Sequence, residues 1–338
     1  MTGRTENGKG GPPAGRAGPL EVAVGVITRE RPRMFADCLA ALERLEMPAD
    51  VTPLFIFVEN DTSLHVEALA HRFAETTGHR VIAAAEPRLG IPFARNRVLA
   101  IALAEGADAL AFLDDDEEAD PLWLAAHVAA FRAGKAVLAG GAMQVLDPSG
   151  PLGRMERWML AGWRDLEARI DRRNRRHLAR GDRRKLHVRC GNWFVDLDFV
   201  RRHDLRFEEG HALSAGEDGA FRAAVVRAGG RLDWVPEAVV GERATHARLA
   251  PGHVLRRFAD ATATRQRRLG KGGGVRGWLR LPVALAGDVT LALGHLALFP
   301  LRPGPALFRA LMRLGKAIGR VKALSGGEGD YYRTVTGR

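Results

Sequence analysis

An apolar stretch that ends in five consecutive acidic residues constrains this sequence more than any other feature. Residues 109–113 (ALAFL) are followed directly by Asp114, Asp115, Asp116, Glu117 and Glu118. A short apolar run between helical patterns is typical of a buried parallel strand. Ligands of open α/β sheets bind beyond the carboxyl ends of such strands. We therefore expect this strand to bring carboxylates to the mouth of a site.

Carboxylates this close together raise one another's pKa unless a cation holds them. Mg²⁺ and Mn²⁺ bind such oxygens, often together with substrate phosphates. An alternative is the start of a helix, where acidic side chains favour the helix dipole. Glu117, Glu118 and Asp120 precede Trp123 and fit that alternative. It leaves Asp114, directly at the strand end, without an explanation, so we favour metal and phosphate chemistry.

The positive charge of the chain is concentrated in two segments. The 338 residues carry a formal net charge of +11. Residues 154–189 contain 13 Arg or Lys against 5 Asp or Glu, a net +8, and residues 251–338 contain 16 against 4, a net +12. The remainder is therefore net acidic. Such asymmetry indicates a polyanionic partner, either a nucleic acid or an anionic membrane surface.

Cysteine usage and the N-terminal segment bear on the compartment. Cys38 and Cys190 are the two cysteines, and they lack the spacing of metal ligands. This argues against a disulfide framework and against a zinc site. Residues 1–19 are rich in Gly and Pro without an apolar core, so we expect a disordered tail rather than a signal peptide. The catalytic part is expected in a reducing cytoplasm.

Strands and helices alternate through the first half of the chain. Apolar runs at 20–27, 54–58, 80–85 and 109–113 are separated by helical patterns, and each is followed by polar residues. This alternation predicts a mostly parallel α/β sheet flanked by helices. The turn after the first strand lacks the dinucleotide-binding G-x-G-x-x-G, and a P-loop pattern, G-x-x-x-x-G-K-[ST], does not occur in the sequence. Further strands are expected at 136–145, 189–195 and 232–240, with an Arg-rich helical excursion at 154–189.

The segment from 256 to 338 differs from the rest. Residues 279–301 are mostly apolar, but Asp288 and His295 interrupt them. A spanning helix needs about 20 nearly uncharged residues, so an interfacial helix or helical hairpin is expected. Residues 307–321 form a basic amphipathic pattern. We expect contact with an anionic membrane surface, on the inner face of the plasma membrane. The alternative is a helical lid packed on the catalytic domain.

Five motifs, in order, together resemble family 2 glycosyltransferases of the GT-A fold, particularly the bacterial exopolysaccharide branch. They are residues 28–32 (TRERP) after the first strand, 58–61 (VEND), 90–96 (GIPFARN), 112–117 (FLDDDE) and 216–218 (GED). A single D-x-D is a weak signal, but five motifs at plausible spacing are a strong one. The resemblance runs from about Glu21 to about Arg257. It implies a disordered tail at 1–19, a GT-A domain at 20–255 and a helical extension at 256–338.

The resemblance implies a nucleotide-sugar donor, usually linked to UDP, with Mg²⁺ or Mn²⁺ on the diphosphate. The residues that it assigns to the donor are Thr28, Glu30, Glu59, Asp61, Arg95, Asp114 and Asp115. Glu59 departs from the Asp that is more usual in that family, which leaves the identity of the base open. The implied metal ligands are Asp116, Asp114 and His246, the last through a neutral ring nitrogen.

Catalysis and acceptor binding are also implied by the resemblance. Asp218 matches the general base that takes a proton from the acceptor hydroxyl, and Glu217 is its orienting neighbour. The alternative for this pair is simple capping of a helix. Asn192 and Trp193 lie where the family shapes the acceptor pocket, although a core tryptophan fits equally well. A single in-line displacement implies an inverting enzyme acting on a glycan or lipid-linked acceptor in cell-surface or exopolysaccharide synthesis.

Two other function classes stay open at this point. A sugar-phosphate nucleotidyltransferase shares the metal–nucleotide chemistry, but its Gly-rich phosphate loop is absent after the first strand. A nucleic-acid-binding protein would explain the charge, but it would interleave basic residues with exposed aromatics. The basic C-terminal segment has few aromatics and much aliphatic surface, so we expect a membrane partner and no nucleic acid. The sugar, acceptor and linkage do not follow from the sequence, because small pocket contacts decide them.

Overall fold

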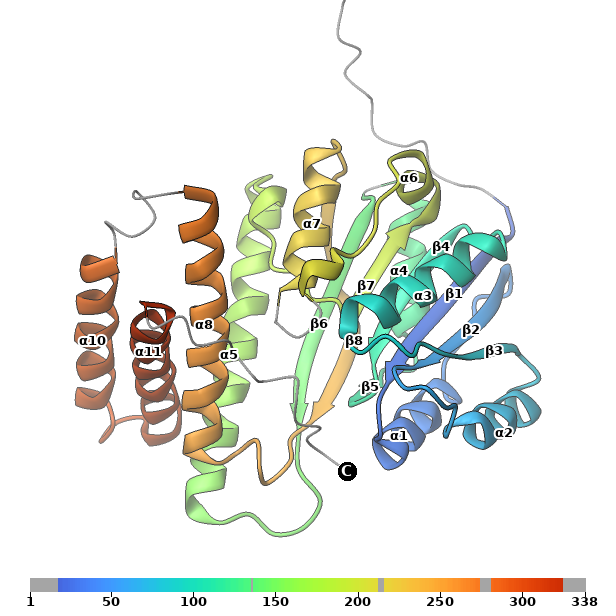
Figure 1. The fold of residues 1–338 in the computed structure, drawn as a ribbon. Coiled ribbons are helices and arrows are strands. Elements are labelled where there is room, and N and C mark those ends of the chain that lie inside the picture. Colours follow the sequence, from blue (N-terminus) through green and yellow to red (C-terminus); the bar gives the residue numbers. More distant parts are fainter. Residues whose placement is uncertain (1–17, 135, 212–215, 274–280, 325–338) are drawn as a thin grey trace, which may run out of the picture.

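The computed structural model describes residues 18–134, 136–211, 216–273 and 281–324 (Figure 1). The described strands are β1 (Leu20–Thr28), β2 (Val51–Glu59), β3 (Arg80–Ala85), β4 (Ala109–Asp114), β5 (Glu117–Ala119), β6 (Leu138–Leu146), β7 (Asn192–Asp196) and β8 (Leu232–Arg243). The described α-helices are α1 (Pro32–Leu42), α2 (Glu67–Thr77), α3 (Ile91–Ala104), α4 (Trp123–Arg132), α5 (Arg154–Ala179), α6 (Leu197–Arg202), α7 (Glu217–Arg227), α8 (Pro251–Gly273), α10 (Leu281–Ala297) and α11 (Pro303–Leu324).

The eight strands form one mixed sheet in the order β3-β2-β1-β4-β7-β6-β8-β5. β1 to β4 run parallel, as the alternation of strands and helices predicts. β7 lies antiparallel between β4 and β6, while β6 and β8 are parallel to each other. The expected mostly parallel, helix-flanked sheet is confirmed. Glu117 and Glu118 lie in the short strand β5, which pairs antiparallel with β8, rather than in a helix.

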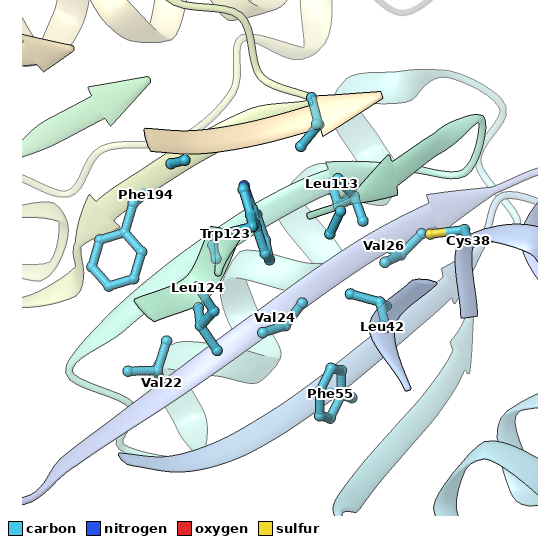
Figure 2. Close-up of a cluster of buried hydrophobic side chains, with 14 of the residues drawn as sticks. Val22, Val24, Val26, Cys38, Leu42, Phe55, Leu113, Trp123, Leu124 and Phe194 are labelled. Atoms are coloured by element: carbon cyan, nitrogen blue, oxygen red, sulfur yellow. The ribbon is translucent and has the colours of Figure 1, made fainter. Parts of the chain in front are cut away.

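Apolar side chains on both faces of the sheet explain the helical layers. Val22, Val24 and Val26 of β1 alternate onto one face, where they meet residues of α1, α2 and α4 (Figure 2). Ala23 faces the other side, with α3, α6 and α7. Gly25 is needed there, because a Cβ at this position would lie 2.3 Å from a methyl group of a valine on α3. Burial on both faces is what a parallel strand without polar alternation predicts.

A further helical layer lies beside the sheet. α5, α8 and α11 pack on one another, and α10 packs on α11 at the outer side (Figure 1). Met159 and Trp163 of α5 and Phe308 of α11 belong to a third buried cluster. The expected C-terminal helical extension is thereby confirmed. No described helix is long and apolar enough to cross a membrane.

Two expectations fall mostly or partly outside the described residues. The tail predicted to be disordered covers residues 1–19, of which the structure describes only the last two. The extension from 256 to 338 includes residues 274–280 and 325–338, which are not described. The domain boundaries stay predictions.

Candidate active site

Three neighbouring parallel strands end at one edge of the sheet. Thr28 ends β1, Glu59 ends β2 and Asp114 ends β4. Thr28 pairs with Glu59, and Ile27 pairs with Asp114, so the three ends lie side by side. Glu30, in the turn after β1, is half-buried and has a positive φ of 51°. The strand register therefore gathers residues that the sequence assigned to one donor site.

Each of the three aspartates that follow β4 accepts a hydrogen bond from a different arginine. The pairs are Arg95 Nη2 with Asp114 Oδ1 (3.0 Å), Arg31 Nη1 with Asp115 Oδ1 (3.1 Å) and Arg248 Nη2 with Asp116 Oδ2. Thr28 Oγ1 donates to the second oxygen of Asp115 at 2.8 Å. Both oxygens of Asp115 are therefore engaged within the protein, which suits a role in fixing the turn.

The other two aspartates each keep one oxygen unused. No described residue donates a hydrogen bond to Asp114 Oδ2 or to Asp116 Oδ1. Mg²⁺ typically binds through one or two carboxylates together with substrate phosphates, so this donor set fits a divalent cation completed by a diphosphate. Among the described residues, no group of three or more His, Cys, Asp or Glu is placed to hold a metal by itself.

His246, the third predicted metal ligand, lines the same cavity as Asp116 and has hydrogen-bond partners of its own. Its Nδ1 lies 2.7 Å from Glu156 Oε1, and its Nε2 lies 3.0 Å from the carbonyl oxygen of Ser149. Both oxygens are acceptors, so both ring nitrogens donate, and the hydrogen bond to Glu156 raises the pKa of His246. Both ring nitrogens are thus engaged within the protein in this structure. The place of His246 in the metal set, which the resemblance implied, stays a prediction.

A buried arginine connects the acidic turn to the start of α7. Arg95 is 4% exposed, and its Nη1 donates to Glu217 Oε1 at 2.6 Å while its Nη2 holds Asp114. Asp218 follows on the same helix turn, is half-buried and accepts a hydrogen bond from the backbone of Gly219 at 2.6 Å. Burial raises the pKa of Asp114, and the charge of Asp218 adds to the rise. Arg95 thus connects the end of β4 to Glu217, the direct neighbour of Asp218.

The electrostatics of this edge favour a bound cation. Burial raises the pKa of Glu117 and of Glu242, which pair across β5 and β8. Burial also raises the pKa of Asp115 to about 7. For Asp116 burial acts in the same direction and is the largest single cause, but the guanidinium groups of Arg248, Arg31 and Arg257 together outweigh it and lower the pKa. Carboxyls outnumber the guanidinium groups here, so a divalent ion would relieve their mutual repulsion.

The two acids predicted to meet the base differ in accessibility. Glu59 is 1% exposed, and its Oε2 accepts hydrogen bonds at 2.5 and 3.1 Å from the backbone N–H groups of His65 and Val66. It thereby fixes the chain that leads into α2. Asp61 is half-buried and accepts a hydrogen bond from the backbone N–H of Thr62 at 2.6 Å. Of the two, Asp61 is the one that a ligand can reach.

Asn192 and Trp193, predicted to shape the acceptor pocket, lie in the core. Asn192 is 2% exposed, and its Oδ1 accepts hydrogen bonds from Trp123 Nε1 at 2.8 Å and His127 Nε2 at 2.9 Å. Trp193 is 0% exposed. Neither side chain can meet a sugar in this arrangement, because β7 is an inner strand of the sheet. The core alternative for Trp193 accounts for its burial.

Sequence reasoning missed Arg31, Arg248 and Glu242. Arg31 stands in the turn motif after β1, so its position was a signal that went unused. Arg248 follows Asp116 by more than a hundred residues, and no local pattern links the two. Glu242 meets the site only because β8 pairs with β5.

Sequence comparisons with known proteins support a glycosyltransferase. The model of "Glycosyl transferase family 2" matches residues 23–195. The chain is 28% identical over 274 residues to the succinoglycan biosynthesis protein ExoM of Rhizobium meliloti (strain 1021), covering 79% of this chain and 81% of ExoM.

Two solved structures are similar to this chain, and the first of them shares the fold. The mannosyltransferase PcManGT from Pyrobaculum calidifontis, solved with GDP-Man and Mn²⁺, matches at a TM-score of 0.58 and 15% identity over 94% of this chain and 90% of that chain. S. aureus TarS matches at a TM-score of 0.47 and 14% identity over 90% of this chain, which spans 55% of TarS. The family match decides among the three function classes that the sequence left open. The chain belongs to glycosyl transferase family 2 and is a glycosyltransferase of the GT-A fold.

Proposed function

We propose that the chain is an inverting, metal-dependent glycosyltransferase, which moves a sugar from a nucleotide-sugar donor to a hydroxyl of a glycan or lipid-linked acceptor. The observation that carries the proposal is the pair of unused oxygens, Asp114 Oδ2 and Asp116 Oδ1, at the carboxyl edge of the sheet. The donor is expected to be UDP-linked, as the motif resemblance implies. The curated relative's name supports a place in polysaccharide biosynthesis.

Asp114 and Asp116 would hold the metal, with Mn²⁺ supported by its presence in the similar mannosyltransferase. When bound, the cation would neutralise the charge that develops on the departing diphosphate. Asp61 and Glu30 lie at the ends of neighbouring strands, where they can meet the nucleoside. Arg95 forms ion pairs with Asp114 and Glu217. Its proposed role is therefore to hold these two carboxylates in place rather than to contact the base.

Asp218 is the proposed general base. The acceptor oxygen forms a bond to the anomeric carbon while the bond from that carbon to the diphosphate oxygen breaks. The hydroxyl proton passes to the Asp218 carboxylate, and the nucleoside diphosphate leaves with the electron pair of the broken bond. Glu217 is less suited as the base, because it is 4% exposed and its carboxylate is paired with Arg95. One displacement inverts the anomeric centre.

We also propose that the outer face of α10, together with the turn that follows it at Leu301, contacts a membrane surface. Val283, Leu293 and Leu301 are 77%, 62% and 79% exposed, respectively. Asp288, which interrupts the apolar run, is 3% exposed and paired with Arg313 and Arg320 of α11. Part of the positive charge of this segment is therefore neutralised internally, and apolar contact carries more of the proposed attraction than the sequence suggested.

The test is incubation of the protein with a panel of UDP- and GDP-sugars, with Mn²⁺ or with EDTA. We expect one donor to release free nucleotide slowly in Mn²⁺ and not in EDTA. ¹H NMR at early times should reveal a free sugar whose anomeric configuration is opposite to that of the donor. Retained configuration would contradict the inverting mechanism. Equal release in EDTA would contradict metal dependence, and no release or thermal stabilisation with any donor would contradict the proposed activity.

A further inference from the structure

Arg248 joins three parts of the molecule at the acidic edge. It lies between β8 and α8, and its side chain is 9% exposed. Nη1 donates to Glu242 Oε1 near the end of β8, and Nη2 donates to Asp116 Oδ2 in the turn after β4. One planar guanidinium thus holds the buried carboxylate of Glu242 and the partly exposed carboxylate of Asp116 in a fixed geometry, which a point charge such as an ammonium does not do.

The backbone that carries Arg248 is anchored independently of this ion pair. The next residue, Leu249, is 0% exposed and packs in the third hydrophobic cluster with Val254. The Leu249 N–H also donates to the carbonyl of Thr245 at 3.1 Å. The packed helical layer therefore positions the segment between β8 and α8 so that Arg248 reaches Asp116. We expect a substitution of the Arg248 side chain to leave the backbone of this segment in place.

The hydrogen bond from Arg248 takes one oxygen of Asp116 and leaves the other. Asp116 lines a cavity of about 230 Å³ next to the site. A carboxylate that is held through one oxygen cannot rotate its second oxygen away from a ligand. Residues that orient a ligating carboxylate in this way typically change metal affinity or activity by about 10–100-fold when they are replaced.

We propose that Arg248 is a positioning residue, which fixes Asp116 through Oδ2 so that Oδ1 faces the donor diphosphate and its metal. This inference rests on the proposed metal-dependent donor site. It assigns the C-terminal helical layer a part in donor binding, because that layer holds the segment that presents Arg248. Glu242 is the second anchor of the same guanidinium and keeps it from following Asp116 if the turn moves.

The test compares Arg248→Lys with Arg183→Lys. Arg183 is the matched control, because it pairs with Asp233, a buried acid at the opposite end of β8. Mn²⁺ affinity is measured by EPR of free Mn²⁺ in the presence of saturating UDP or GDP, whichever stabilises the wild type. We expect Arg248→Lys to bind Mn²⁺ about 10–100-fold more weakly, and Arg183→Lys to bind it like the wild type. The melting temperature of each variant is measured alongside.

Equal Mn²⁺ affinity in a folded Arg248→Lys overturns the positioning role while leaving the donor site standing. A wild type that binds neither nucleotide with Mn²⁺ overturns the donor site, and the inference with it. If Arg248→Lys does not fold, Glu242→Gln replaces it, because this variant keeps both Arg248 and Asp116. Weaker Mn²⁺ binding in Glu242→Gln supports the role of Arg248 in positioning, and unchanged binding overturns it.

Discussion

At the scale of residues, some carboxylates of the site are paired within the protein, and others remain accessible to a ligand. Glu217 is buried and paired with Arg95, whereas Asp218 is half-buried beside it. Both carboxylate oxygens of Asp115 accept hydrogen bonds, one from Thr28 and one from Arg31. Asp114 and Asp116 each keep one carboxylate oxygen that accepts no hydrogen bond from the described residues, so these oxygens can bind a metal.

Asp218→Asn should lower turnover by about 10²–10⁴-fold, the usual contribution of a general base. The amide keeps the size of the side chain but cannot accept a proton at neutral pH, so donor affinity should stay near that of the wild type. Initial rates and donor titrations on both forms measure this. Asp198→Asn is the control, since Asp198 also lies in the first turn of a helix. Near-normal turnover in Asp218→Asn would exclude it as the base.

His127 should make the protein sensitive to acid. Burial lowers its pKa to about 4, although the hydrogen bond with Asn192 acts in the opposite direction. The unfolded chain has a histidine pKa of about 6.5, so it binds more protons than the folded state between these values. The contribution of neutral His127 to the free energy of unfolding is therefore fully present above about pH 6.5. It is lost as the pH falls through about 4, and the total loss is about 3 kcal/mol.

The measurement for His127 is the free energy of unfolding in urea at several pH values between 4 and 7. His127→Gln cannot titrate in this range, so its curve should be flatter than that of the wild type. Parallel curves for the two proteins would mean that His127 is not the group that responds.

At the scale of elements, the strands of the first half and their polar ends followed from local pattern. β1 to β4 occur where apolar runs predicted them, and their register brings Thr28, Glu59 and Asp114 together. The position of β7 did not follow, because strand order depends on pairings between distant segments. For that reason Asn192 and Trp193 were expected at a pocket, although the side chains packed on the two faces of β7 bury both. The contact of Arg248 with Asp116 did not follow from the sequence for the same reason.

Arg95 on α3 should hold α7 against the end of β4. Arg95→Met leaves the carboxylates of Asp114 and Glu217 without their guanidinium, and breaking a buried pair in this way typically costs about 3–5 kcal/mol. Arg97→Met is the matched control, since Arg97 is exposed two residues further along the same helix. Urea unfolding and hydrogen exchange at the start of α7 measure the effect. If the two variants had equal free energies of unfolding, Arg95 would not be the residue that holds α7 against the end of β4.

At the scale of the whole molecule, the C-terminal helices belong to the body that carries the site. α11 packs on α5 and α8, and Phe308 closes the third cluster. Deleting residues 275–338 would expose that cluster, so substitution is the sharper test of membrane contact. Val283 and Leu293 of α10 and Leu301 in the turn after it are highly exposed, so they can be changed without touching the core.

Replacing Val283, Leu293 and Leu301 together by Ser should weaken binding to anionic vesicles at least 10-fold, because each apolar side chain removed from water contributes about 1.5–3 kcal/mol. Co-sedimentation with vesicles measures this. The control replaces three exposed apolar residues elsewhere, Leu89, Leu122 and Met155, by Ser. If both triple variants bind vesicles as tightly as the wild type, α10 is not the contact surface.

Titration of the protein with UDP and with GDP, with and without Mn²⁺, on wild type and Asp116→Asn, tests the donor site most directly. The wild type should bind one of these nucleotides more tightly in Mn²⁺, because Asp114 and Asp116 offer their unused oxygens to the ion that bridges the diphosphate. Asp116→Asn should stay folded, with a lower melting temperature because Arg248 loses one of its two carboxylate partners, and should lose the effect of Mn²⁺. Nucleotide affinity in Mn²⁺ that is the same in Asp116→Asn as in the wild type would contradict the site.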